Sequence, residues 1–477
     1  MAVYKFSNAP QRREYLDQDA RTVVISFILS GIFWLLLGSV LAILASFKLH
    51  WPQFLDQAAY LTFGRVRPLH LNTMVYGWAS MTGSGVGLWI LMRTLRVTIP
   101  YKRLLFLSLT IWNISLLIGS IQLLAGITHG MEWLEIPFGP AVGMVVSILM
   151  ITFVALMMLF NKATKHLYSS VYYIIAGFLW IPSLLLIAYI PEYSSPIEGG
   201  MNWWYAHNAL GLWFTPLCLA AAYFFIPKVT GRPIYSYWLS LLGFWSLALF
   251  YNWNGFHHLI GGPVPTWAIT VSIAASVMMI IPVVTVAVNH HMTVYGAFDR
   301  VVNSPTLRFV VFGAMSYTVV SLQGSFQALR SFNEIIHFTH YVIAHAHIGM
   351  YAFVTMVLFG SVYYIMPRIL QWEWSSKKLI KLHFWLAALG IILYVVALQI
   401  GGIHQGILLN NPDVPFMDIV NTMIPYLQSR SFAAIMLTAA HLIFAWLVLK
   451  MAWDAFLAED KAVQPQPVVS VQSSKQA

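Results

Sequence analysis

Six of the 16 histidines in this chain have positions that suit metal binding. They are His70, His207, the adjacent His257 and His258, and the closely spaced His345 and His347. All six lie in or at the ends of long apolar segments, where an ionisable side chain is a functional candidate. No Asp or Glu falls inside these segments, and the single cysteine, Cys218, excludes a thiolate cluster. Imidazoles without carboxylates or thiolates suit haem iron and copper better than calcium or magnesium.

The spacing of the paired histidines indicates two different uses. Residues two apart on a helix point about 200° apart, so His345 and His347 would serve two separate centres from one helix. His257 and His258 would be about 100° apart on a helix, and a kink near Gly255 would let both reach one metal. Together with His207 they form a three-imidazole set, which suits copper.

The elements that must position these histidines are predicted to be transmembrane helices. The chain is 59% hydrophobic and only 9% charged, whereas a soluble domain has about 25% charged residues. Apolar runs long enough to span a bilayer predict an all-α polytopic membrane protein of about twelve helices. These runs cover residues 22–47, 69–92, 104–129, 140–160, 168–190, 203–226, 236–260, 267–288, 308–329, 337–366, 379–402 and 431–453.

The distribution of positive charge predicts the orientation. Only five of the 26 Lys and Arg residues fall in the loops of one side, namely Lys48, Arg65, Arg67, Arg330 and Arg430. The positive-inside rule therefore places both termini in the cytoplasm and all six histidines near the external face. The net charge of +10 follows from this topology and does not indicate nucleic-acid binding. We expect a cytoplasmic segment over 1–21, one membrane domain over 22–456 and a disordered cytoplasmic tail over 457–477.

Four motifs, in this order, resemble the cbb3-type cytochrome c oxidases of the haem-copper oxidase superfamily. They are Arg67-Pro68-Leu69-His70, Trp203-Trp204-Tyr205-Ala206-His207-Asn208, a similar stretch from Gly231 to Leu259, and Ala344-His345-Ala346-His347. The resemblance covers essentially the whole membrane domain. It implies a catalytic subunit in the bacterial inner membrane that reduces O2 to water and translocates protons. Its electrons would come from cytochrome c through membrane-anchored c-type cytochrome subunits.

The resemblance also implies a role for each candidate residue. His70 and His347 would bind a low-spin haem b, and His345 would bind a high-spin haem b. His207, His257 and His258 would hold copper opposite the high-spin haem. Tyr251 would be covalently linked to His207 and would give an electron and a proton to oxygen; a helix continuing past it would place it about 1.7 turns before His257.

Further family features map onto polar residues outside the metal set. The implied proton path from the cytoplasm consists of Thr215, Tyr223, Tyr237, Ser240 and Tyr317. The implied haem-propionate region, associated in the family with a calcium ion, consists of Glu132, Glu135, Asn333 and His337. Three positions depart from the family: Gln323 replaces a Glu 22 residues before the proximal histidine, Gly243 replaces a histidine of the proton path, and His340 stands where an acid is common.

Other interpretations predict different observations. Nitric oxide reductase shares the six histidines, but it uses non-haem iron with buried glutamates, and this chain has Gly211 one turn after His207. A transporter with a histidine relay would show internal repeats and broken helices at the midplane, which the sequence does not indicate. His441 is expected to be structural, and no chemistry is predicted for the cytoplasmic-side His166, His290, His291 and His383.

Overall fold

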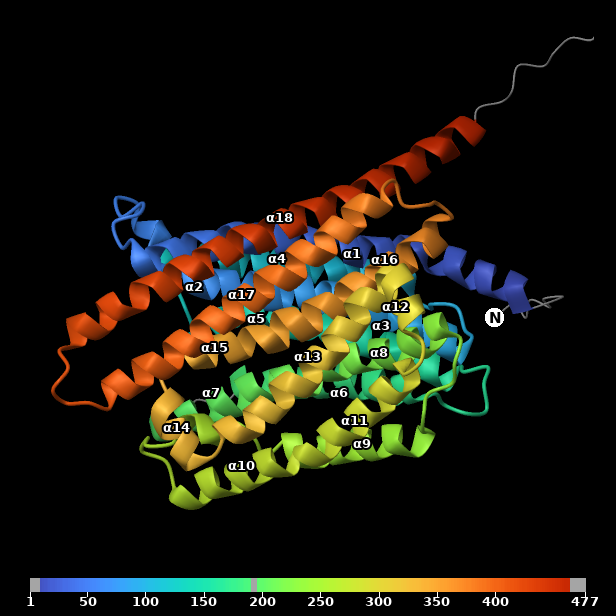
Figure 1. Cartoon of the computed structure of the whole chain (residues 1–477). Helices are drawn as coiled ribbons and strands as arrows, with labels where there is room; N and C mark the ends of the chain where they lie inside the picture. The colour runs from blue at the N-terminus through green and yellow to red at the C-terminus, as the bar shows by residue number, and fades with distance from the viewer. Residues whose placement is uncertain (1–8, 190–194, 464–477) are drawn as a thin grey trace, which may run out of the picture.

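The computed structural model describes residues 9–189 and 195–463, and this part of the chain is almost entirely helical (Figure 1). Within it, the only β pairing is an isolated bridge between Met131 and Leu134. Large apolar side chains such as Trp245, Leu249 and Ile400 are exposed on the outer faces of the helices. An outward-facing apolar surface of this kind fits a lipid environment, which confirms the all-α membrane fold class.

Ten helical stretches of the described residues are long and apolar enough to cross a membrane. Seven are single helices: α1 (Ala9–His50), α4 (Lys102–Ala125), α5 (Phe138–Phe160), α6 (Ser169–Tyr189), α13 (Pro305–Gln327), α17 (Lys377–Leu409) and α18 (Phe416–Val463). Three are composite: α7 (Ser195–Ala209) with η3 (Leu210–Phe214) and α8 (Thr215–Thr230); α10 (Thr266–Met278) with α11 (Ile280–Val294); and α15 (His340–His347) with η5 (Ile348–Thr355) and α16 (Met356–Leu370).

The two remaining predicted segments are also helical. One is the continuous run of α2 (Phe63–Asn72), η2 (Thr73–Ala79) and α3 (Ser80–Leu95). The other is α9 (Tyr237–Tyr251), whose 15 residues rise only about 22 Å. Short helices complete the chain: η1 (Ala59–Leu61), η4 (Phe256–Leu259), α12 (Phe298–Asn303) and α14 (Arg330–Ile336).

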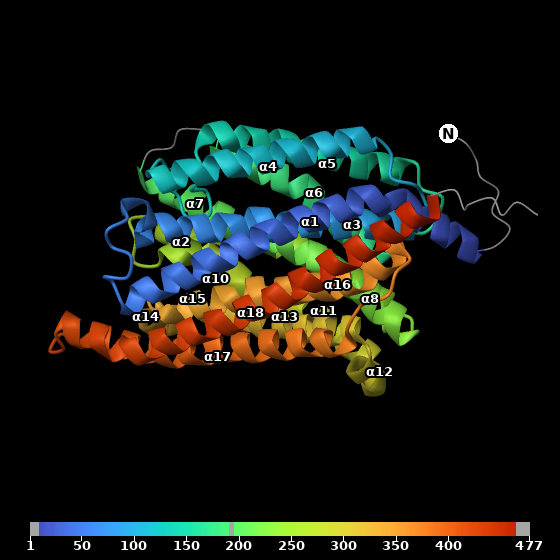
Figure 2. The same cartoon turned by 90° about the horizontal axis from the view of Figure 1, so that it is seen from above.

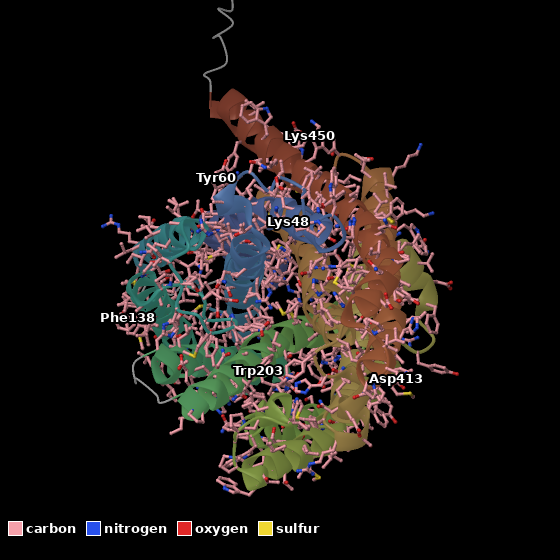
Figure 3. The ribbon with its side chains drawn as sticks, turned by 90° about the vertical axis from the view of Figure 1, so that its left-hand side faces the viewer. Lys48, Tyr60, Phe138, Trp203, Asp413 and Lys450 are labelled. Carbon is pink, nitrogen blue, oxygen red and sulfur yellow. The ribbon has the colours of Figure 1, made fainter. Side chains whose placement is uncertain are left out.

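The helices lie side by side as one bundle. From above, α4 and α5 form one edge and α17 the opposite edge, with α1 packed between α3 and α18 (Figure 2). Viewed end-on, Tyr60, Phe138, Trp203 and Asp413 lie around the end that faces the viewer (Figure 3). Loops predicted to be external therefore gather at one end of the bundle.

The structure corrects the predicted seventh segment, 236–260. α9 ends at Tyr251, and His257 and His258 lie on the separate turn η4. Gly255 makes this break: its φ is +113°, and a Cβ there would lie 2.5 Å from the carbonyl oxygen of Trp203. Only glycine tolerates both the dihedral angle and the close backbone approach. The expectation that Tyr251 lies 1.7 helical turns before His257 is wrong, because the intervening residues do not continue the helix.

The predicted termini need one further correction. α1 already begins at Ala9, so most of the predicted cytoplasmic segment 1–21 is a helical extension of the first span. α18 continues to Val463, so residues 457–463 are helical and not part of a disordered tail. The rest of the predicted tail, 464–477, lies outside the described residues.

Three wide helical turns were not predicted from the sequence. The π-helical segments η2, η3 and η5 follow directly after His70, His207 and His347, beginning within three residues of each. A π turn inserts an extra residue and changes the direction of the side chains around it, and such turns are frequent at functional sites. Each wide turn thus marks a helix that carries a candidate metal ligand.

Candidate metal-binding site

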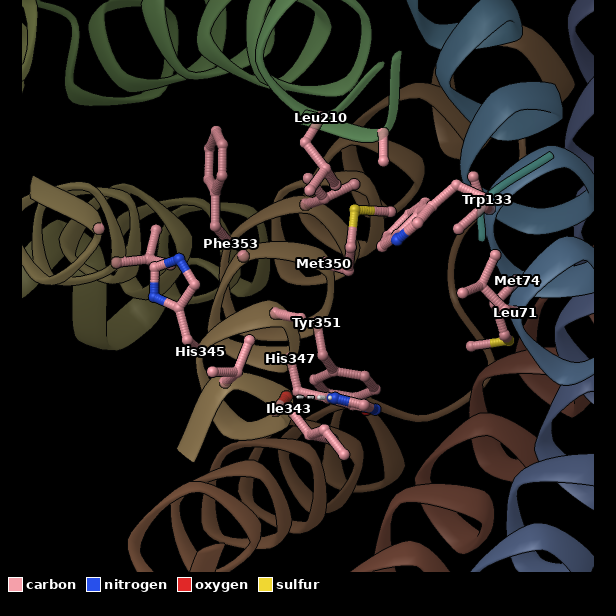
Figure 4. A pocket seen from close by; sticks show the side chains of 18 of the residues that line it. Leu71, Met74, Trp133, Leu210, Ile343, His345, His347, Met350, Tyr351 and Phe353 are labelled. Atoms are coloured by element: carbon pink, nitrogen blue, oxygen red, sulfur yellow. Dashed lines mark hydrogen bonds between the residues drawn. The ribbon is translucent and has the colours of Figure 1, made fainter. Parts of the chain in front are cut away.

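All six candidate histidines line one cavity of about 540 Å³. The cavity is enclosed by residues of α2, α7, η4, α13 and α15, with α1 and α18 closing its far side. Its wall also carries the apolar side chains of Leu71, Leu210 and Phe353 (Figure 4). The structure therefore brings together residues that are up to 277 positions apart in the sequence (His70 to His347).

His207, His257 and His258 form a compact triad. One nitrogen from each ring can be chosen so that all three lie within 4.8 Å of one another. The ring centroids are 4.9 Å apart for His207 and His257, and 4.5 Å apart for His257 and His258. Three imidazole nitrogens this close together could hold a single metal ion.

Neighbouring side chains orient the triad. The Nδ1 atom of His257 lies 3.0 Å from the hydroxyl of Ser276 and 3.3 Å from that of Ser272, which leaves Nε2 for a metal. Trp203 stacks on His258 with the centroids 4.2 Å apart and an angle of 11° between the planes. The Nδ1 atom of His207 is buried and has no hydrogen-bond partner among the described residues. A buried nitrogen without a partner, next to two oriented imidazoles, fits a metal ligand.

His345 and His347 project from α15 in opposite directions, as the sequence predicted (Figure 4). His345 Nδ1 lies 3.0 Å from Gln323 Oε1, and His347 Nδ1 donates to the carbonyl of Ile343 at 2.8 Å. In His345 the bond to Nδ1 leaves Nε2 available for a metal, whereas Nε2 of His347 lies 3.3 Å from the hydroxyl of Tyr394, which a metal would have to replace. One short helix thus presents ligands to two sides of the cavity.

His70 is oriented in the same way as His347. Its Nδ1 atom donates to the carbonyl oxygen of Gly38 at 2.8 Å, so Nε2 is again the available nitrogen. A histidine that ligates a metal usually donates its other ring N–H to an acceptor, which fixes the tautomer. His70 and His347 carry this arrangement from two different helices on one cavity, which suits the two axial ligands of a haem.

Tyr251 packs against the triad through a contact that depends on Gly211. The Tyr251 and His207 rings have centroids 4.8 Å apart. A Cβ on Gly211 would lie only 1.8 Å from Cε1 of Tyr251, so any larger residue would overlap the ring. The tyrosine ring therefore occupies the space one turn after His207. The sequence singled out both residues, but it did not predict that one makes room for the other.

The residues of the predicted propionate region belong to two separate groups. Arg67 pairs with Glu132 and, at 3.2 Å, with Glu135, whose other oxygen accepts from Asn72 at 2.9 Å. Burial raises the pKa of Glu135, and the Arg67 charge opposes this effect. Asn333 instead donates to the carbonyl of Gln327 at 3.1 Å.

The second group faces the triad. His337 Nε2 lies 3.0 Å from the carbonyl oxygen of His258, so this histidine contacts the turn η4 and not the two glutamates. Asn333, His337, Arg67 and Glu132 all line the cavity, whereas Glu135 lines only the neighbouring pocket beside Arg67.

The predicted proton-path residues also form two groups, one at the metal cavity and one away from it. Thr215 and Tyr317 line the metal cavity. Ser240 donates to the carbonyl of Tyr237 at 2.6 Å, and Tyr237 donates to the carbonyl of Leu167 at 3.0 Å. The Tyr223 hydroxyl lies 3.5 Å from the amide nitrogen of Asn289. No direct hydrogen bond between the side chains of these five residues is described.

Several residues that shape the cavity were not among the predicted site residues. His441, expected to be structural, bridges the hydroxyls of Ser39 (2.7 Å) and Tyr351 (2.9 Å), and all three line the cavity. Ser272 and Ser276 orient His257 from α10, and their i, i+4 spacing on an apolar helix was an available signal. The Tyr394 ring packs against His347 with the centroids 4.5 Å apart and the planes tilted by 32°, and no sequence pattern marked it.

Comparison with known proteins agrees with this geometry. The profile of the family described as "Cytochrome C and Quinol oxidase polypeptide I" matches residues 22–436. "Cytochrome c oxidase subunit 1 homolog" of Azorhizobium caulinodans is 29% identical over 88% of this chain and 80% of that protein. "Cbb3-type cytochrome c oxidase subunit CcoN1" of Stutzerimonas stutzeri is also 29% identical, over 81% of this chain and 84% of its own.

A solved structure shows the same fold. Its title describes a heme-copper terminal oxidase dimer, and it superposes with a TM-score of 0.75 at 16% identity, covering 91% of this chain and 84% of that one. The transporter interpretation fails, because neither the fold nor the family is that of a transporter. With a family match over most of its length and six histidines on one cavity, the chain belongs to subunit I of the haem-copper cytochrome c and quinol oxidases.

Proposed function

We propose that this chain is the catalytic subunit of a cbb3-type terminal oxidase in the bacterial inner membrane. It reduces O2 to water with electrons from cytochrome c, received through membrane-anchored c-type cytochrome subunits, and it couples the reaction to proton translocation with both termini in the cytoplasm. The observation that carries the proposal is the histidine triad with the Tyr251 ring beside it over Gly211.

The residues on the cavity fit two haems b and one copper ion. His70 and His347 would hold the low-spin haem, His345 the high-spin haem, and the triad of His207, His257 and His258 the copper. When bound, these groups supply the electron transfer and the binding of O2. The protein supplies the orientation of four of the rings: Nδ1 of His70, His347, His345 and His257 bonds to Gly38, Ile343, Gln323 and Ser276, respectively.

Tyr251 is proposed as the residue that gives a proton and an electron to oxygen. Its ring lies beside His207 and lines the same cavity as the triad. This contact supports the covalent bond to His207 that the family resemblance implies. Thr215 and Tyr317 line the cavity on the cytoplasmic side and are proposed as the last members of the path that brings protons to it.

The same geometry favours an oxidase over a nitric oxide reductase. Glu132 is the only acid among the described residues that line the cavity, and Arg67 pairs with it. The space one turn after His207 is filled by Tyr251, so a carboxylate could not stand there without displacing the ring. A non-haem iron site helped by buried glutamates does not fit this cavity.

The Arg67–Glu132–Glu135 cluster is proposed to lie beside the haem propionates. Arg67 already forms an ion pair with each of the two carboxylates. A calcium ion bound to the same oxygens would have to displace Arg67, so the geometry favours the ion-pair cluster over a calcium site. Calcium analysis of the purified complex, with Glu132→Gln as the comparison, tests this choice.

The experiment that tests the function is metal, haem and activity analysis of the complex purified with its partner subunits. We expect haem b by the pyridine haemochrome assay, one copper per chain, and O2 consumption with reduced cytochrome c. Non-haem iron in place of copper, with turnover of nitric oxide and not of O2, would establish the reductase. A colourless protein would overturn the assignment of both haems.

A further inference from the structure

His290 is a deeply buried histidine whose ring makes no hydrogen bond. It is 3% exposed, and neither Nδ1 nor Nε2 has a partner among the described residues. The next residue on the same helix, His291, is exposed. Leaving a buried polar atom without a partner costs about 1–3 kcal/mol. No hydrogen bond to the described residues holds the His290 ring in place. Such a ring points to a role in which its two nitrogens change hydrogen-bond partners.

The ring of Tyr223 lies beside His290, and Tyr317 is a second buried tyrosine, on α13. The Tyr223 ring lies with its centroid 4.3 Å from that of His290, at an angle of 61°. Contact of an N–H with the face of the tyrosine ring would satisfy at most one of the two nitrogens. Tyr317 is 2% exposed, and its hydroxyl also has no hydrogen-bond partner of good geometry among the described residues. Water is the partner that would serve both groups.

Two contacts fix how far His290 lies from the cytoplasmic loops. Asn289 accepts from the backbone N–H of Ser236 at 2.8 Å, and Thr293 accepts from that of Tyr235 at 3.0 Å. Both donors belong to the cytoplasmic loop between α8 and α9. The end of α11 is therefore tied to this loop, and His290 lies one helical turn inside it.

The rise of the four helices gives the distance of each group from the end of its own helix. Measured from the cytoplasmic end of each helix at about 1.5 Å per residue, His290 lies about 6 Å deep, Tyr223 about 11 Å, Tyr317 about 18 Å and Tyr251 about 21 Å. Tyr317 and Tyr251 line the metal cavity. His290 and the Tyr223 ring beside it thus lie closer to the helix ends on this side than Tyr317 and Tyr251, which line the metal cavity.

Gly243 leaves α11 as the helix that carries an imidazole in this region. This glycine of α9 faces α11, because a Cβ on it would lie 3.0 Å from Val286 and 3.1 Å from the hydroxyl of Thr285. Val286 is one turn before His290 on the same helix. At Gly243, α9 has no side chain to place between the two helices. His290 lies on α11, one turn closer to the cytoplasm than the Val286 that Gly243 faces.

We propose that His290 carries protons from the cytoplasmic side towards Tyr317 and the metal cavity. An incoming proton binds the free ring nitrogen, and the N–H of the other nitrogen passes its proton through water towards Tyr223 and Tyr317. The ring returns to its starting tautomer by rotation or re-equilibration with water, so no net charge remains on it. This inference rests on the proposed function, since an enzyme that takes up no protons needs no such carrier.

The test compares His290→Gln and His290→Ala with wild type in the complete complex. Proton uptake is followed with a pH-indicator dye after the reduced enzyme is mixed with O2, and steady-state O2 consumption is measured alongside. We expect both variants to slow proton uptake by about tenfold or more, because neither side chain can bind and release a proton. Haem spectra and copper content should remain those of wild type. His291→Gln, one residue away on the exposed face, is the matched control and should behave as wild type.

The glutamine variant separates proton transfer from structure. Glutamine keeps a polar side chain that hydrogen-bonds water, so a structural role would be restored in His290→Gln even if His290→Ala fails to assemble. Proton uptake at the wild-type rate in His290→Gln would overturn the proposal. Absence of O2-dependent proton uptake in wild type would instead refute the proposed function, so the two failures are distinguishable.

Discussion

The hydrogen bond between Gln323 and His345 predicts a measurable effect on the potential of the high-spin haem. Gln323 Oε1 lies 3.0 Å from Nδ1 of His345, and Gln323 Nε2 donates to the hydroxyl of Tyr341 at 2.9 Å. Gln323→Glu keeps the size of the side chain and can accept from both neighbours, because the Tyr341 hydroxyl can turn to donate. The change therefore adds a negative charge behind the proximal imidazole without removing a contact.

The size of the effect follows from Coulomb's law. An iron bound at Nε2 of His345 would lie about 7 Å from the carboxylate, allowing about 4 Å for the ring and the metal bond beyond the hydrogen bond. At an effective dielectric constant of about 20, two unit charges at this distance interact with about 2.4 kcal/mol. For one electron this corresponds to about 100 mV. The charge stabilises the ferric state, so the Glu variant should have the lower potential.

The assay is a redox titration of the high-spin haem in wild type, Gln323→Glu and Gln323→Leu. The leucine variant removes the acceptor without adding charge, so it separates the hydrogen bond from the electrostatic effect. We expect its potential to lie at or above that of wild type. An unchanged or raised potential in Gln323→Glu would refute the reasoning, and would mean that the carboxylate is protonated or that another group such as Glu334 already supplies the charge.

Four further predictions follow from the site. His70→Ala and His347→Ala should each remove the low-spin haem signal while copper is retained, and a variant that lost copper alone would reverse the assignment. His257→Ala should lose copper and at least about 100-fold of O2 reduction while the low-spin haem stays; full turnover would exclude the triad as the copper site. Tyr251→Phe should abolish O2 reduction with all metals bound, and mass spectrometry of active wild type should show the Tyr251 peptide joined to that of His207, whereas separate unmodified peptides would contradict the bond. Gly211→Ala should force the Tyr251 ring away from a Cβ 1.8 Å from it, at a cost of about 1–3 kcal/mol and with a large loss of turnover; wild-type turnover would show that the ring position is not needed.

The local composition of the sequence was sufficient to predict the helices. Each of the twelve predicted segments corresponds to helical structure, because an apolar run in a bilayer has to satisfy its backbone within the segment. The distribution of Lys and Arg also placed the six histidines at one depth, and the two-residue spacing of His345 and His347 predicted their opposite directions. These properties depend on residues close together in the chain, which is why sequence alone determines them.

The contacts between helices were decided only by the tertiary structure. The sequence could not show that the Tyr251 ring lies over Gly211 or that His441 bridges Ser39 and Tyr351. Nor could it show that His290 is buried with no hydrogen-bond partner among the described residues. Nor did it predict where α9 stops, since the break at Gly255 is required by the approach of the Trp203 backbone from another helix. Whether a polar atom finds a partner, and whether a glycine is needed, depends on what packs against it from distant parts of the chain. Residue type and spacing therefore determined which groups can bind metals, and packing decided which nitrogen each one presents.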